Sequence, residues 1–360
     1  MKILVCNWKD PAHPEAGGAE VYTDECTRRW AAWGHQVTWL SAAVAGRPAI
    51  EMVGGVTVRR SGSRLGVYGA VRRFLRSHAH RYDVVLDEIN TRPFFAHRHA
   101  GATPVVALAY QVAREVWRHE TSTPVALLGR YVLEPHWLPA YTDVPVMTIS
   151  PSSADSLADY GMRDVRLVPV GVDIADAPRP TKADELTLLV CGRLVPMKRP
   201  DHAIAAFAAA RARLGGGRLV VIGDGRSGPS LRASAPEGVV FTGRVDEAAK
   251  RRLMARSHAL LATSVREGWG LVVSEAAALG TPTIAYDVAG LRDSTRAGRG
   301  VLVVEDPDAL AEAITYWAPR MRARPPDPIP HGGAENWDTV AAAVLDILSR
   351  AAGAERRLAA

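Results

Sequence analysis

Cysteine and long apolar runs are scarce in this 360-residue chain, and each absence excludes a class of protein. The three cysteines, Cys6, Cys26 and Cys191, are scattered and lack the paired spacing of a zinc site or a disulfide framework. The opening run Met1–Cys6 is too short for a signal sequence or a membrane span. We therefore expect a soluble protein of the reducing cytoplasm. No segment repeats at a fixed period, which argues against a solenoid.

Acidic residues are outnumbered, with 38 Asp and Glu against 44 Lys and Arg, for a net charge of +6. Such a balance favours polyanions or an anionic membrane surface, although an arginine- and alanine-rich composition alone produces it. Because no nucleic-acid motif accompanies the charge, we expect no nucleic-acid partner. The basic amphipathic stretch 71–81 leaves two interpretations open: a solvated helix face, or peripheral contact with the inner face of the membrane.

Short apolar segments alternate with helical stretches along the chain, a pattern typical of βα units and parallel sheets. A helix is expected from about residue 19 to 33. The predicted strands of a first α/β domain are 3–6, 36–40, 83–86, 104–108 and 145–149, and those of a second are 186–191, 218–222, 239–241, 259–262, 283–285 and 300–303.

Proline-bearing polar segments mark the predicted domain boundaries. We place the first domain at 1–170, a linker at 171–185 and the second domain at 186–330. The remaining segment, 331–360, contains an amphipathic helix from Trp337 to about Leu348 that could pack back on the first domain.

The segment 264–282 is the most unusual part of the sequence. It contains an apolar helix, 271–279, that follows glycines and ends at Gly280 and Pro282. Glu275 shares a helix face with apolar residues, so a carboxylate lies on a face expected to be buried and needs a partner. The hydroxyls of a ribose would supply donors, and the open N–H groups at the helix start attract phosphate. The alternative is a glutamate paired with a local arginine in a structural helix.

Two further groups surround this helix in the sequence. Gly268 and Gly270 allow close approach of the backbone to a ligand, and Glu267 lies in the preceding loop, where it would face a sugar or serve as an ordinary loop residue. Arg193 and Lys198 follow the first strand of the second domain, at the strand end where doubly wound sheets bind ligands. Two fixed cations there could neutralise a diphosphate without a metal, unless the loop is only a solvated basic one.

Two other motifs favour structural interpretations. The spacing of glycines in 223–228 fits a dinucleotide fingerprint, but Pro229 follows at once and no acidic residue ends the next strand. Asp306 and Asp308 have the spacing of a metal-binding pair. Asp306 is, however, a good N-cap for the helix that follows, with Pro307 in its first turn.

Taken together and in order, five motifs resemble those of the retaining GT-B glycosyltransferases of family four. They are Gly17-Gly18-Ala19-Glu20, the segment 169–173, Gly192-Arg193-Leu194 with Lys198, the segment 221–225, and Glu267 to Leu271 with Glu275. The resemblance spans nearly the whole chain. It implies two facing Rossmann-like domains that close over a sugar-nucleotide donor held mainly by the second, with transfer to an acceptor hydroxyl under retention of anomeric configuration.

The resemblance also assigns roles. Arg193 and Lys198 would bind the diphosphate, Glu275 the ribose, Glu267 the sugar hydroxyls, and the backbone near Gly243 and Val245 the base. Further donor-binding candidates are Gly17, Gly18, Gly268, Trp269, Gly270, Leu271 and Val272, and the acceptor or sugar-side candidates are Glu88, Tyr110 and Gln111. No metal and no cofactor beyond the nucleotide-sugar substrate is implied, and the acceptor could be a small molecule, a lipid or a glycan.

One position departs from the family pattern. Where the family commonly has a histidine that reaches the donor sugar, this chain has Tyr110, followed by Gln111. The donor could lack a 6-hydroxyl, His119 or Glu115 could substitute, or the change could be neutral. Two other functions stay open: a sugar-nucleotide epimerase on the same architecture, and a catalytically silent partner protein that retains the fold.

Overall fold

The computed structural model describes residues 1–172 and 181–358. Most of the expected linker, including Asp176–Pro180 and the end of the 169–173 motif, lies outside the described residues. The chain divides into two compact units. Unit 1 comprises Met1–Arg114, Leu128–Gly171 and Asn336–Ala360, and unit 2 comprises Glu115–Leu127 and Val172–Glu335.

Unit 1 is built on an eight-stranded sheet in the order β3-β4-β2-β1-β5-β6-β7-β8. Its pairs are parallel except for β3 with β4. The strands are β1 (Lys2–Cys6), β2 (Gln36–Ser41), β3 (Ile50–Val53), β4 (Val56–Arg60), β5 (Val84–Ile89), β6 (Val105–Ala109), β7 (Val146–Thr148) and β8 (Val165–Leu167).

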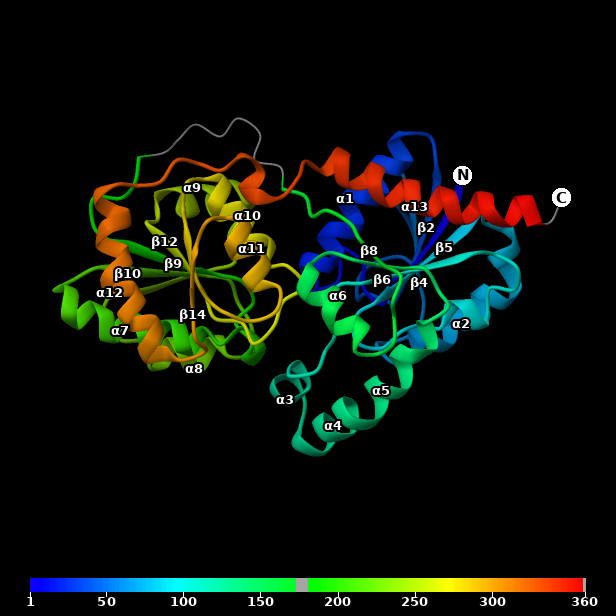
Figure 1. Ribbon diagram of the computed structural model, residues 1–360. Helices are drawn as coiled ribbons and strands as arrows, with labels where there is room; N and C mark the ends of the chain where they lie inside the picture. Colours follow the sequence, from blue (N-terminus) through cyan, green and yellow to red (C-terminus); the bar gives the residue numbers. More distant parts are fainter. Residues whose placement is uncertain (173–180, 359–360) are drawn as a thin grey trace. The chain divides into compact units, whose positions relative to one another are not determined.

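Helices cover both faces of this sheet, because alternate strand residues point to opposite sides and both sets are apolar. Ile3 and Val5 pack toward α1 (Gly18–Ala32) and α13 (Trp337–Leu358), whereas Leu4 and Cys6 pack toward α2 (Gly66–His78) (Figure 1). The shorter helices of unit 1 are η1 (Ala79–Arg81), η2 (Ala96–Arg98), η3 (Gly129–Leu133), α5 (Glu134–Trp137), η4 (Leu138–Tyr141) and α6 (Pro151–Ala158). Helix α3 (Val116–Glu120) and all but the last residue of α4 (Thr123–Leu128) belong to unit 2.

Unit 2 is built on a six-stranded, wholly parallel sheet in the order β11-β10-β9-β12-β13-β14. The strands are β9 (Thr187–Cys191), β10 (Arg218–Ile222), β11 (Val239–Gly243), β12 (Ala259–Ala262), β13 (Thr283–Tyr286) and β14 (Val301–Val303).

One face of this sheet packs on α7 (Pro200–Leu214) and α12 (Pro307–Ala323). The other face packs on α9 (Glu247–Arg256), α10 (Leu271–Ala278) and α11 (Leu291–Ala297). The remaining helices are η5 (Pro196–Lys198), α8 (Gly228–Ala233) and η6 (Pro330–Gly333). The predicted pair of doubly wound α/β domains is confirmed.

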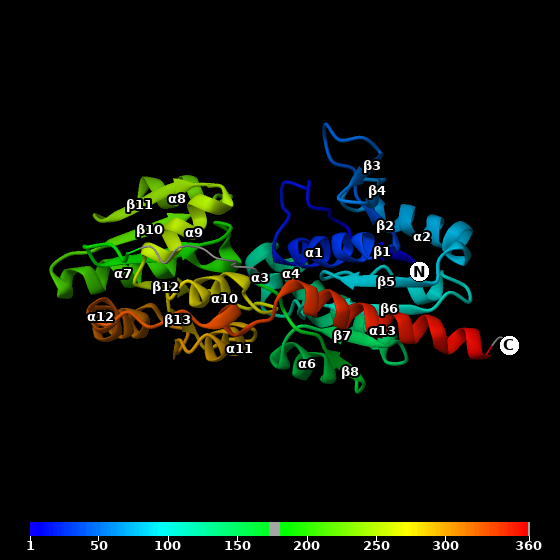
Figure 2. The same cartoon turned by 90° about the horizontal axis from the view of Figure 1, so that it is seen from above.

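The last helix, α13, returns to unit 1 and lies along α1, as both views show (Figure 1 and Figure 2). Trp30 Nε1 donates to the Ala341 carbonyl over 2.8 Å, and the Tyr22 and Trp337 rings meet edge to face at 5.6 Å. Val340, Val344 and other apolar residues of the helix complete the core above the sheet. The expectation that the helix packs back on the first domain is confirmed.

The predicted strands all exist, with ends within a few residues of those expected. The hairpin β3–β4 and the short strand β8 were not predicted. The turn of the hairpin, Gly54-Gly55, has the positive φ angles of 56° and 84° that a tight hairpin turn requires. Among the described residues, no helix is both long and apolar enough to cross a membrane.

Candidate functional site

The site residues of unit 2 lie where the order of its sheet reverses. Strand β9 pairs with β10 on one side and with β12 on the other. From β9 the chain first adds strands on one side of the sheet, up to β11, and then crosses to the other side with β12, so the switch point lies between β9 and β12. Parallel sheets bind ligands at such switch points, beyond the carboxyl ends of the strands. Arg193 and Lys198 follow β9, and Glu267 follows β12. Topology therefore brings the two predicted clusters to one edge of one sheet.

The two loops at this edge are bonded to each other. Val265 N donates to the Met197 carbonyl over 2.8 Å, and Thr263 Oγ1 donates to the carbonyl oxygens of Lys198 and Arg199. The Lys198 ammonium forms an ion pair with Glu267 Oε1, which also accepts from Ser264 Oγ over 2.6 Å. Lys198 and Glu267 thus form a partly exposed ion pair that presents both a cation and a carboxylate.

Glycines allow the loop after β9 to lie close to the loop after β10. A β-carbon on Gly223 would lie 1.9 Å from the Gly192 carbonyl oxygen, and Leu194 N donates to the Asp224 carbonyl. This packing fixes the backbone on both sides of Arg193. In the described part of the chain, the Arg193 side chain has no ion-pair or hydrogen-bond partner, although it is only partly exposed. It is an available cation beside the Lys198–Glu267 pair.

Helix α10 begins at this edge, and one of its faces carries partly exposed side chains. Its N-cap, Gly270, has φ 89°, a left-handed conformation that glycine adopts without strain. Leu271, Val272 and Glu275 are partly exposed, whereas Val273 and Ser274 are buried. The face of Glu275, which was expected to be buried, is only partly buried: the Glu275 side chain is 25% exposed.

The partner of Glu275 is a lysine, not the local arginine that the structural alternative names. Its Oε2 lies 3.0 Å from Lys250 Nζ, which also contacts Glu247 at 2.9 Å. Burial works against the charge on Lys250, but the carboxylates of Glu275 and Glu247 together raise its pKa. Burial, and then the negative charge of Glu275, raises the pKa of the Cys191 thiol to about 12, so Glu275 lies near the end of β9. Lys250 was not predicted, since it lies 25 residues away in the sequence on another helix.

The remaining donor candidates lie around the same edge. Trp269 Nε1 donates to Ser274 Oγ over 3.0 Å, which holds the loop of Gly268 against α10. Gly290 closes the opposite side of this loop, because a β-carbon there would lie 2.1 Å from the Glu267 carbonyl oxygen. Gly243 ends β11 with φ 70° and open space around its α-carbon, and Val245 is partly buried beside it.

The segment 115–127, which the sequence places in the first domain, packs within unit 2. Glu120 Oε1 accepts from Met197 N over 3.2 Å, and Glu120 Oε2 pairs with Arg226 at 3.1 Å. Glu115 pairs with the buried Arg266 at 2.9 Å. Burial and the nearby charge of Arg199 lower the pKa of His119. Both residues named as substitutes for a family histidine are therefore beside the Lys198 turn.

The acceptor-side candidates lie at the carboxyl ends of β5 and β6 in unit 1, beside the switch point between β1 and β5. Glu88 is 1% exposed and accepts from Asn7 Nδ2 over 2.6 Å and from Thr23 Oγ1 over 2.7 Å. The Tyr110 hydroxyl is bonded to Thr23 Oγ1 and to the Ala19 carbonyl. Both side chains thus face the first turns of α1, not solvent. Gln111 is partly exposed, and its Oε1 has no partner among the described residues.

Gly17 and Gly18 begin α1 at the same edge. Gly17 N donates to Glu20 Oε2 over 2.7 Å, and Lys9 Nζ lies 3.2 Å from the same oxygen. Glu20 therefore occupies one backbone donor of the helix start that a ligand phosphate would otherwise attract. The structure brings these glycines to the end of β1, in unit 1, and the other donor candidates to unit 2.

The aspartate pair after β14 has a structural role. Asp306 Oδ2 accepts from Ala309 N over 2.9 Å at the N-cap of α12, as the capping interpretation predicts. Throughout residues 1–172 and 181–358, no three His, Cys, Asp or Glu side chains gather as metal ligands would.

Family comparisons cover both halves of the chain. A family model described as "Glycosyltransferase Family 4" matches residues 16–176, and one described as "Glycosyl transferases group 1" matches residues 185–318. A D-inositol 3-phosphate glycosyltransferase of Streptomyces avermitilis is 26% identical, over 96% of this chain and 86% of its own length.

Solved structures show the same fold. A sucrose-phosphate synthase of Thermosynechococcus elongatus matches with a TM-score of 0.74 and 20% identity, over 98% of this chain and 99% of its own. An Anabaena protein solved with UDP and glucose matches with a TM-score of 0.67 and 18% identity, over 97% of this chain and 100% of its own. From its two matched family regions and its GT-B fold, the chain belongs to the family-four glycosyltransferases.

Proposed function

We propose that this glycosyltransferase moves a hexose-type sugar from a nucleoside-diphosphate sugar to an acceptor hydroxyl, with retention of anomeric configuration and without a metal. The observation that carries the proposal is the cluster at the switch point of unit 2. The carboxyl ends of β9 and β12 carry three groups there: Arg193, the Lys198–Glu267 pair, and the partly exposed Glu275. Each group has the chemistry of one part of such a donor.

The diphosphate carries the largest charge on the donor, and two cations match it. Arg193 offers a fork of N–H groups that fits phosphate oxygens, and Lys198 offers a point charge. The N-terminus of α10, capped by Gly270, adds backbone N–H groups. The loop contacts fix the backbone that carries these groups, so little backbone reorganisation is needed as charge develops on the leaving diphosphate.

The ribose and the sugar fit the two carboxylates. Glu275 lies on the open face of α10 and can accept from ribose hydroxyls, with Lys250 holding the carboxylate in place. Glu267 keeps one oxygen engaged with Lys198 and Ser264, which leaves the other for sugar hydroxyls. Gly243 and Val245 lie at the end of β11, where the backbone would contact the base.

The transfer breaks the bond between the anomeric carbon and the diphosphate oxygen and forms one to the acceptor oxygen on the same face. The acceptor proton passes to the departing diphosphate oxygen. In this route the protein positions the reactants and stabilises the diphosphate charge, and no side chain attacks the sugar.

The acceptor-side residues differ in whether they can contact a substrate directly. Glu88 and Tyr110 are buried and bonded to the first turns of α1, so we propose that they position the Gly17–Gly18 end of that helix. Gln111 is the one of the three that can contact a substrate directly, since its Oε1 lacks a partner among the described residues. The proposed acceptor is a hydroxyl-bearing small molecule, lipid or glycan.

The experiment is turnover of hexose and 6-deoxyhexose donors, each on UDP, GDP, ADP and TDP, with and without EDTA. Proton NMR of the product reports its anomeric configuration. We expect an unchanged rate with EDTA and a product with the donor's anomeric configuration. An inverted product would contradict retention, and loss of activity that Mg²⁺ restores would contradict metal independence. Epimerised donor without transfer would favour the epimerase alternative.

A further inference from the structure

The two cations proposed for the diphosphate differ in their surroundings. Among the described residues, the Arg193 side chain has no ion-pair or hydrogen-bond partner, whereas the Lys198 ammonium is paired with Glu267 Oε1. The side chains of Lys198 and Glu267 are 27% and 14% exposed, so water and salt screen this pair only in part. A diphosphate can therefore reach Arg193 directly, but it must compete with a carboxylate for Lys198.

A second donor holds the Glu267 carboxylate against Lys198. Ser264 is buried, and its Oγ donates to the same carboxylate oxygen, Oε1, over 2.6 Å. The other oxygen, Oε2, has no partner in the described part of the chain. One oxygen of Glu267 thus neutralises Lys198, while the other can accept a hydrogen bond from a sugar hydroxyl.

The backbone on both sides of the ion pair is fixed, so a change of partner needs only side-chain movement. Thr263 Oγ1 donates to the Lys198 carbonyl over 3.0 Å, and Lys198 N donates to the Val195 carbonyl over 2.9 Å. Glu267 N donates to the Ala289 carbonyl over 3.0 Å. The lysine side chain is flexible and its ammonium has three donors, so it can turn from the carboxylate to a phosphate oxygen.

Only one part of a donor can weaken the hold of Glu267 on Lys198. A free nucleoside diphosphate and a complete donor both carry a ribose, which suits Glu275, and a diphosphate, which suits Arg193. The complete donor alone carries the sugar hydroxyls that suit Glu267. A hydroxyl that donates to this carboxylate stabilises its negative charge, and the attraction of the carboxylate for Lys198 falls. Sugar and diphosphate should therefore bind cooperatively.

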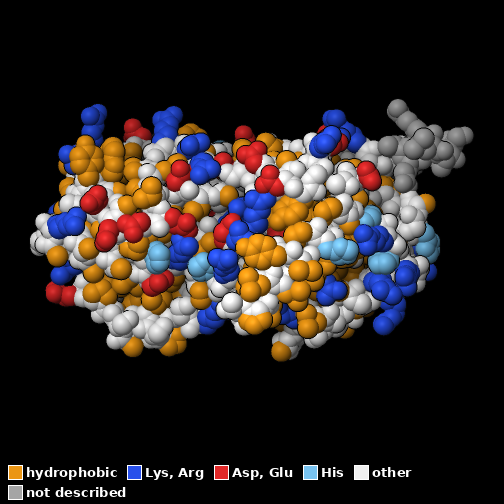
Figure 3. Space-filling model, turned by 60° about the horizontal axis from the view of Figure 1, so that its bottom comes forward, with side chains coloured by type: hydrophobic (Ala, Val, Ile, Leu, Met, Phe, Trp, Pro, Cys, Tyr) orange, Lys and Arg blue, Asp and Glu red, His pale blue; other side chains and the backbone are white. Residues whose placement is uncertain are grey.

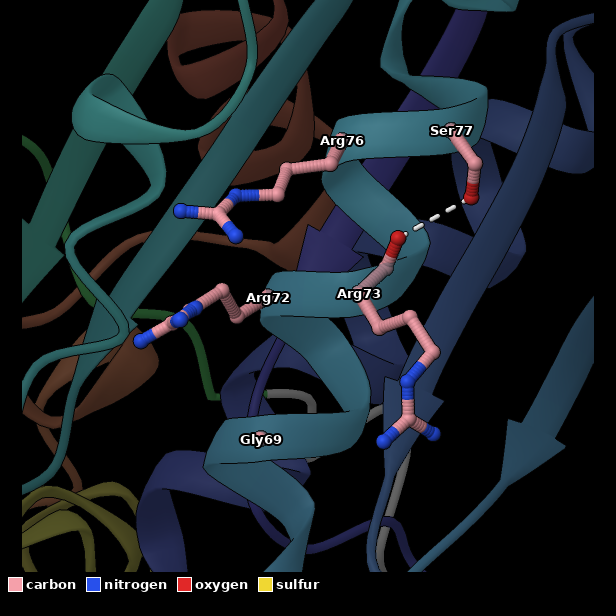
Figure 4. A pocket seen from close by; sticks show the side chains of 5 residues that line it. All are labelled: Gly69, Arg72, Arg73, Arg76 and Ser77. Carbon is pink, nitrogen blue, oxygen red and sulfur yellow. Dashed lines mark hydrogen bonds between the residues drawn. The ribbon is translucent and has the colours of Figure 1, made fainter.

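The arginines of helix α2 show the opposite arrangement. Arg72, Arg73 and Arg76 are exposed, and none forms an ion pair with another described residue. They line a pocket of about 450 Å³ on this helix (Figure 4). In Figure 3, Asp and Glu are interspersed with Lys and Arg over unit 2, whereas Lys, Arg and His gather over α2. Cations without carboxylate partners attract any anion, so the pairing at Lys198 is a feature of the candidate site and not of the basic surface.

We propose that Glu267 makes the site selective for the complete donor over the free nucleoside diphosphate, because it holds Lys198 until sugar hydroxyls bind to the carboxylate. This inference rests on the proposed donor site and adds a second role for Glu267. The nucleoside diphosphate is also a product of the transfer. Once the sugar has left, Glu267 pairs with Lys198 again, and the diphosphate loses one of its two cations, which favours its release.

The test is isothermal titration of the full chain, without acceptor, with UDP, GDP, ADP and TDP and with the glucose and 6-deoxyglucose conjugates of the preferred one. Glu267→Gln removes the charge but keeps the size of the side chain. We expect this variant to bind the free nucleoside diphosphate about fivefold more tightly, because Lys198 is released. It should bind the sugar conjugate no more tightly than the unchanged chain, because the charged acceptor for the sugar hydroxyls is lost. A damaged fold would weaken both.

Lys198→Met separates release of the lysine from simple repulsion between Glu267 and phosphate. In the Lys198→Met chain, adding Glu267→Gln should change the affinity for the nucleoside diphosphate by less than about twofold, since no lysine remains to be released. A gain as large as that in the unchanged chain would show that Glu267 acts by repulsion alone, and would overturn the proposal.

Two controls remove charges elsewhere. Glu185→Gln breaks an ion pair with Arg218, of 3.3 Å, at the amino ends of β9 and β10, and Arg72→Ala with Arg76→Ala removes the unpaired cations of α2. Both should bind each ligand like the unchanged chain. Equal tightening in Glu185→Gln would indicate an effect of net charge and overturn the inference.

The inference and the proposed donor site fail in different ways. If Arg193→Ala weakens binding of the nucleoside diphosphate but Glu267→Gln does not tighten it, the donor site stands and the inference is overturned. If the unchanged chain binds none of the four nucleoside diphosphates, both are overturned. Thermal unfolding verifies that every variant is folded.

Discussion

At the scale of single residues, Glu88 is a buried carboxyl group at the carboxyl end of β5, with a side chain that contacts other elements of unit 1. Burial raises its pKa from the ordinary 4.5 to about 8; the Thr23 hydrogen bond opposes the shift, and the charge of Glu20 adds to it. Glu88 bonds to Asn7 after β1 and to Thr23 in α1, and Tyr110 after β6 bonds to the same Thr23. A neutral carboxyl at neutral pH thus links two strand ends to the first long helix.

Replacing Glu88 should change how stability depends on pH. Its folded-state pKa lies above its unfolded value, so its stabilising contribution is complete below about pH 4.5 and is lost as pH rises through about 8. Glu88→Gln stays neutral at every pH. The stability of this variant relative to the unchanged chain should therefore rise between pH 5 and 8, by on the order of a few kcal/mol, and melting temperatures measured across that range report the change. The exposed Glu237→Gln is the control; a pH-independent difference for Glu88→Gln would contradict this account.

The sequence identified the types of site residue better than their surroundings. Arg193, Lys198, Glu267 and Glu275 follow strands or begin a helix at glycines, and these local patterns are visible in a sequence. The pairing of Glu275 with Lys250 and of Glu267 with Ser264 depends on how helices and loops pack, which no short-range pattern encodes. Tyr110 could likewise be placed after β6, but not bonded to Thr23.

At the scale of elements, the junction between α13 and the end of unit 1's sheet has no spare volume. A β-carbon on Gly171 would lie 2.3 Å from the Trp337 ring, at the start of α13. His331 Nδ1 lies 3.1 Å from the Val172 carbonyl oxygen, and Val172 N donates to the Glu335 carbonyl, so the neighbouring segments are also joined. The 169–173 motif therefore has a packing role in its described part.

Gly171→Ala should destabilise the protein by about 1–3 kcal/mol, because the added methyl group must displace the Trp337 ring. Gly353→Ala lies in α13 with open space around its α-carbon and should stabilise slightly, by up to about 1 kcal/mol, through helix propensity. Chemical denaturation measures both. Equal effects of the two substitutions would show that the ring contact does not hold α13.

Helix α3 supports the turn that carries Lys198. Glu120→Ala removes the acceptor for Met197 N and the partner of Arg226. We expect about fivefold weaker binding of the preferred nucleoside diphosphate, the equivalent of about 1 kcal/mol, because the turn is less well fixed. The control Glu237→Ala removes a surface ion pair with Arg211 and should leave affinity unchanged. Unchanged affinity in Glu120→Ala would limit α3 to a structural role.

Regular elements were the most predictable part of the fold. Most strands of both sheets are short apolar runs followed by glycine or polar residues, and all except β3, β4 and β8 were predicted. The hairpin β3–β4 was missed despite Gly54-Gly55, because β3 is mostly exposed and carries little apolar alternation. The grouping of 115–127 with unit 2 could not be predicted, since it depends on the contacts of Glu115 and Glu120 with residues more than 70 positions away.

At the scale of the whole molecule, the chain combines two α/β units, and most donor-binding candidates lie in one and the acceptor-side candidates in the other. Unit 2 has the cations and carboxylates that suit a nucleoside-diphosphate sugar, and unit 1 has the acceptor-side candidates. Both units place their candidate residues at or beside the switch point of the sheet, after β1, β5 and β6 in one and after β9 and β12 in the other. The fold thus predicts where ligands bind in each unit.

The central claim is that the donor's nucleotide binds at the switch point of unit 2 through Arg193 and Glu275. Isothermal titration with UDP, GDP, ADP and TDP identifies the preferred ligand and tests the site directly. Glu275→Gln and Arg193→Ala should each weaken that binding at least tenfold, since each removes a charge-assisted contact. Glu247→Gln removes the other carboxylate that pairs with Lys250 and should change affinity little. Equal affinities for the unchanged chain, Glu275→Gln and Arg193→Ala would contradict the account.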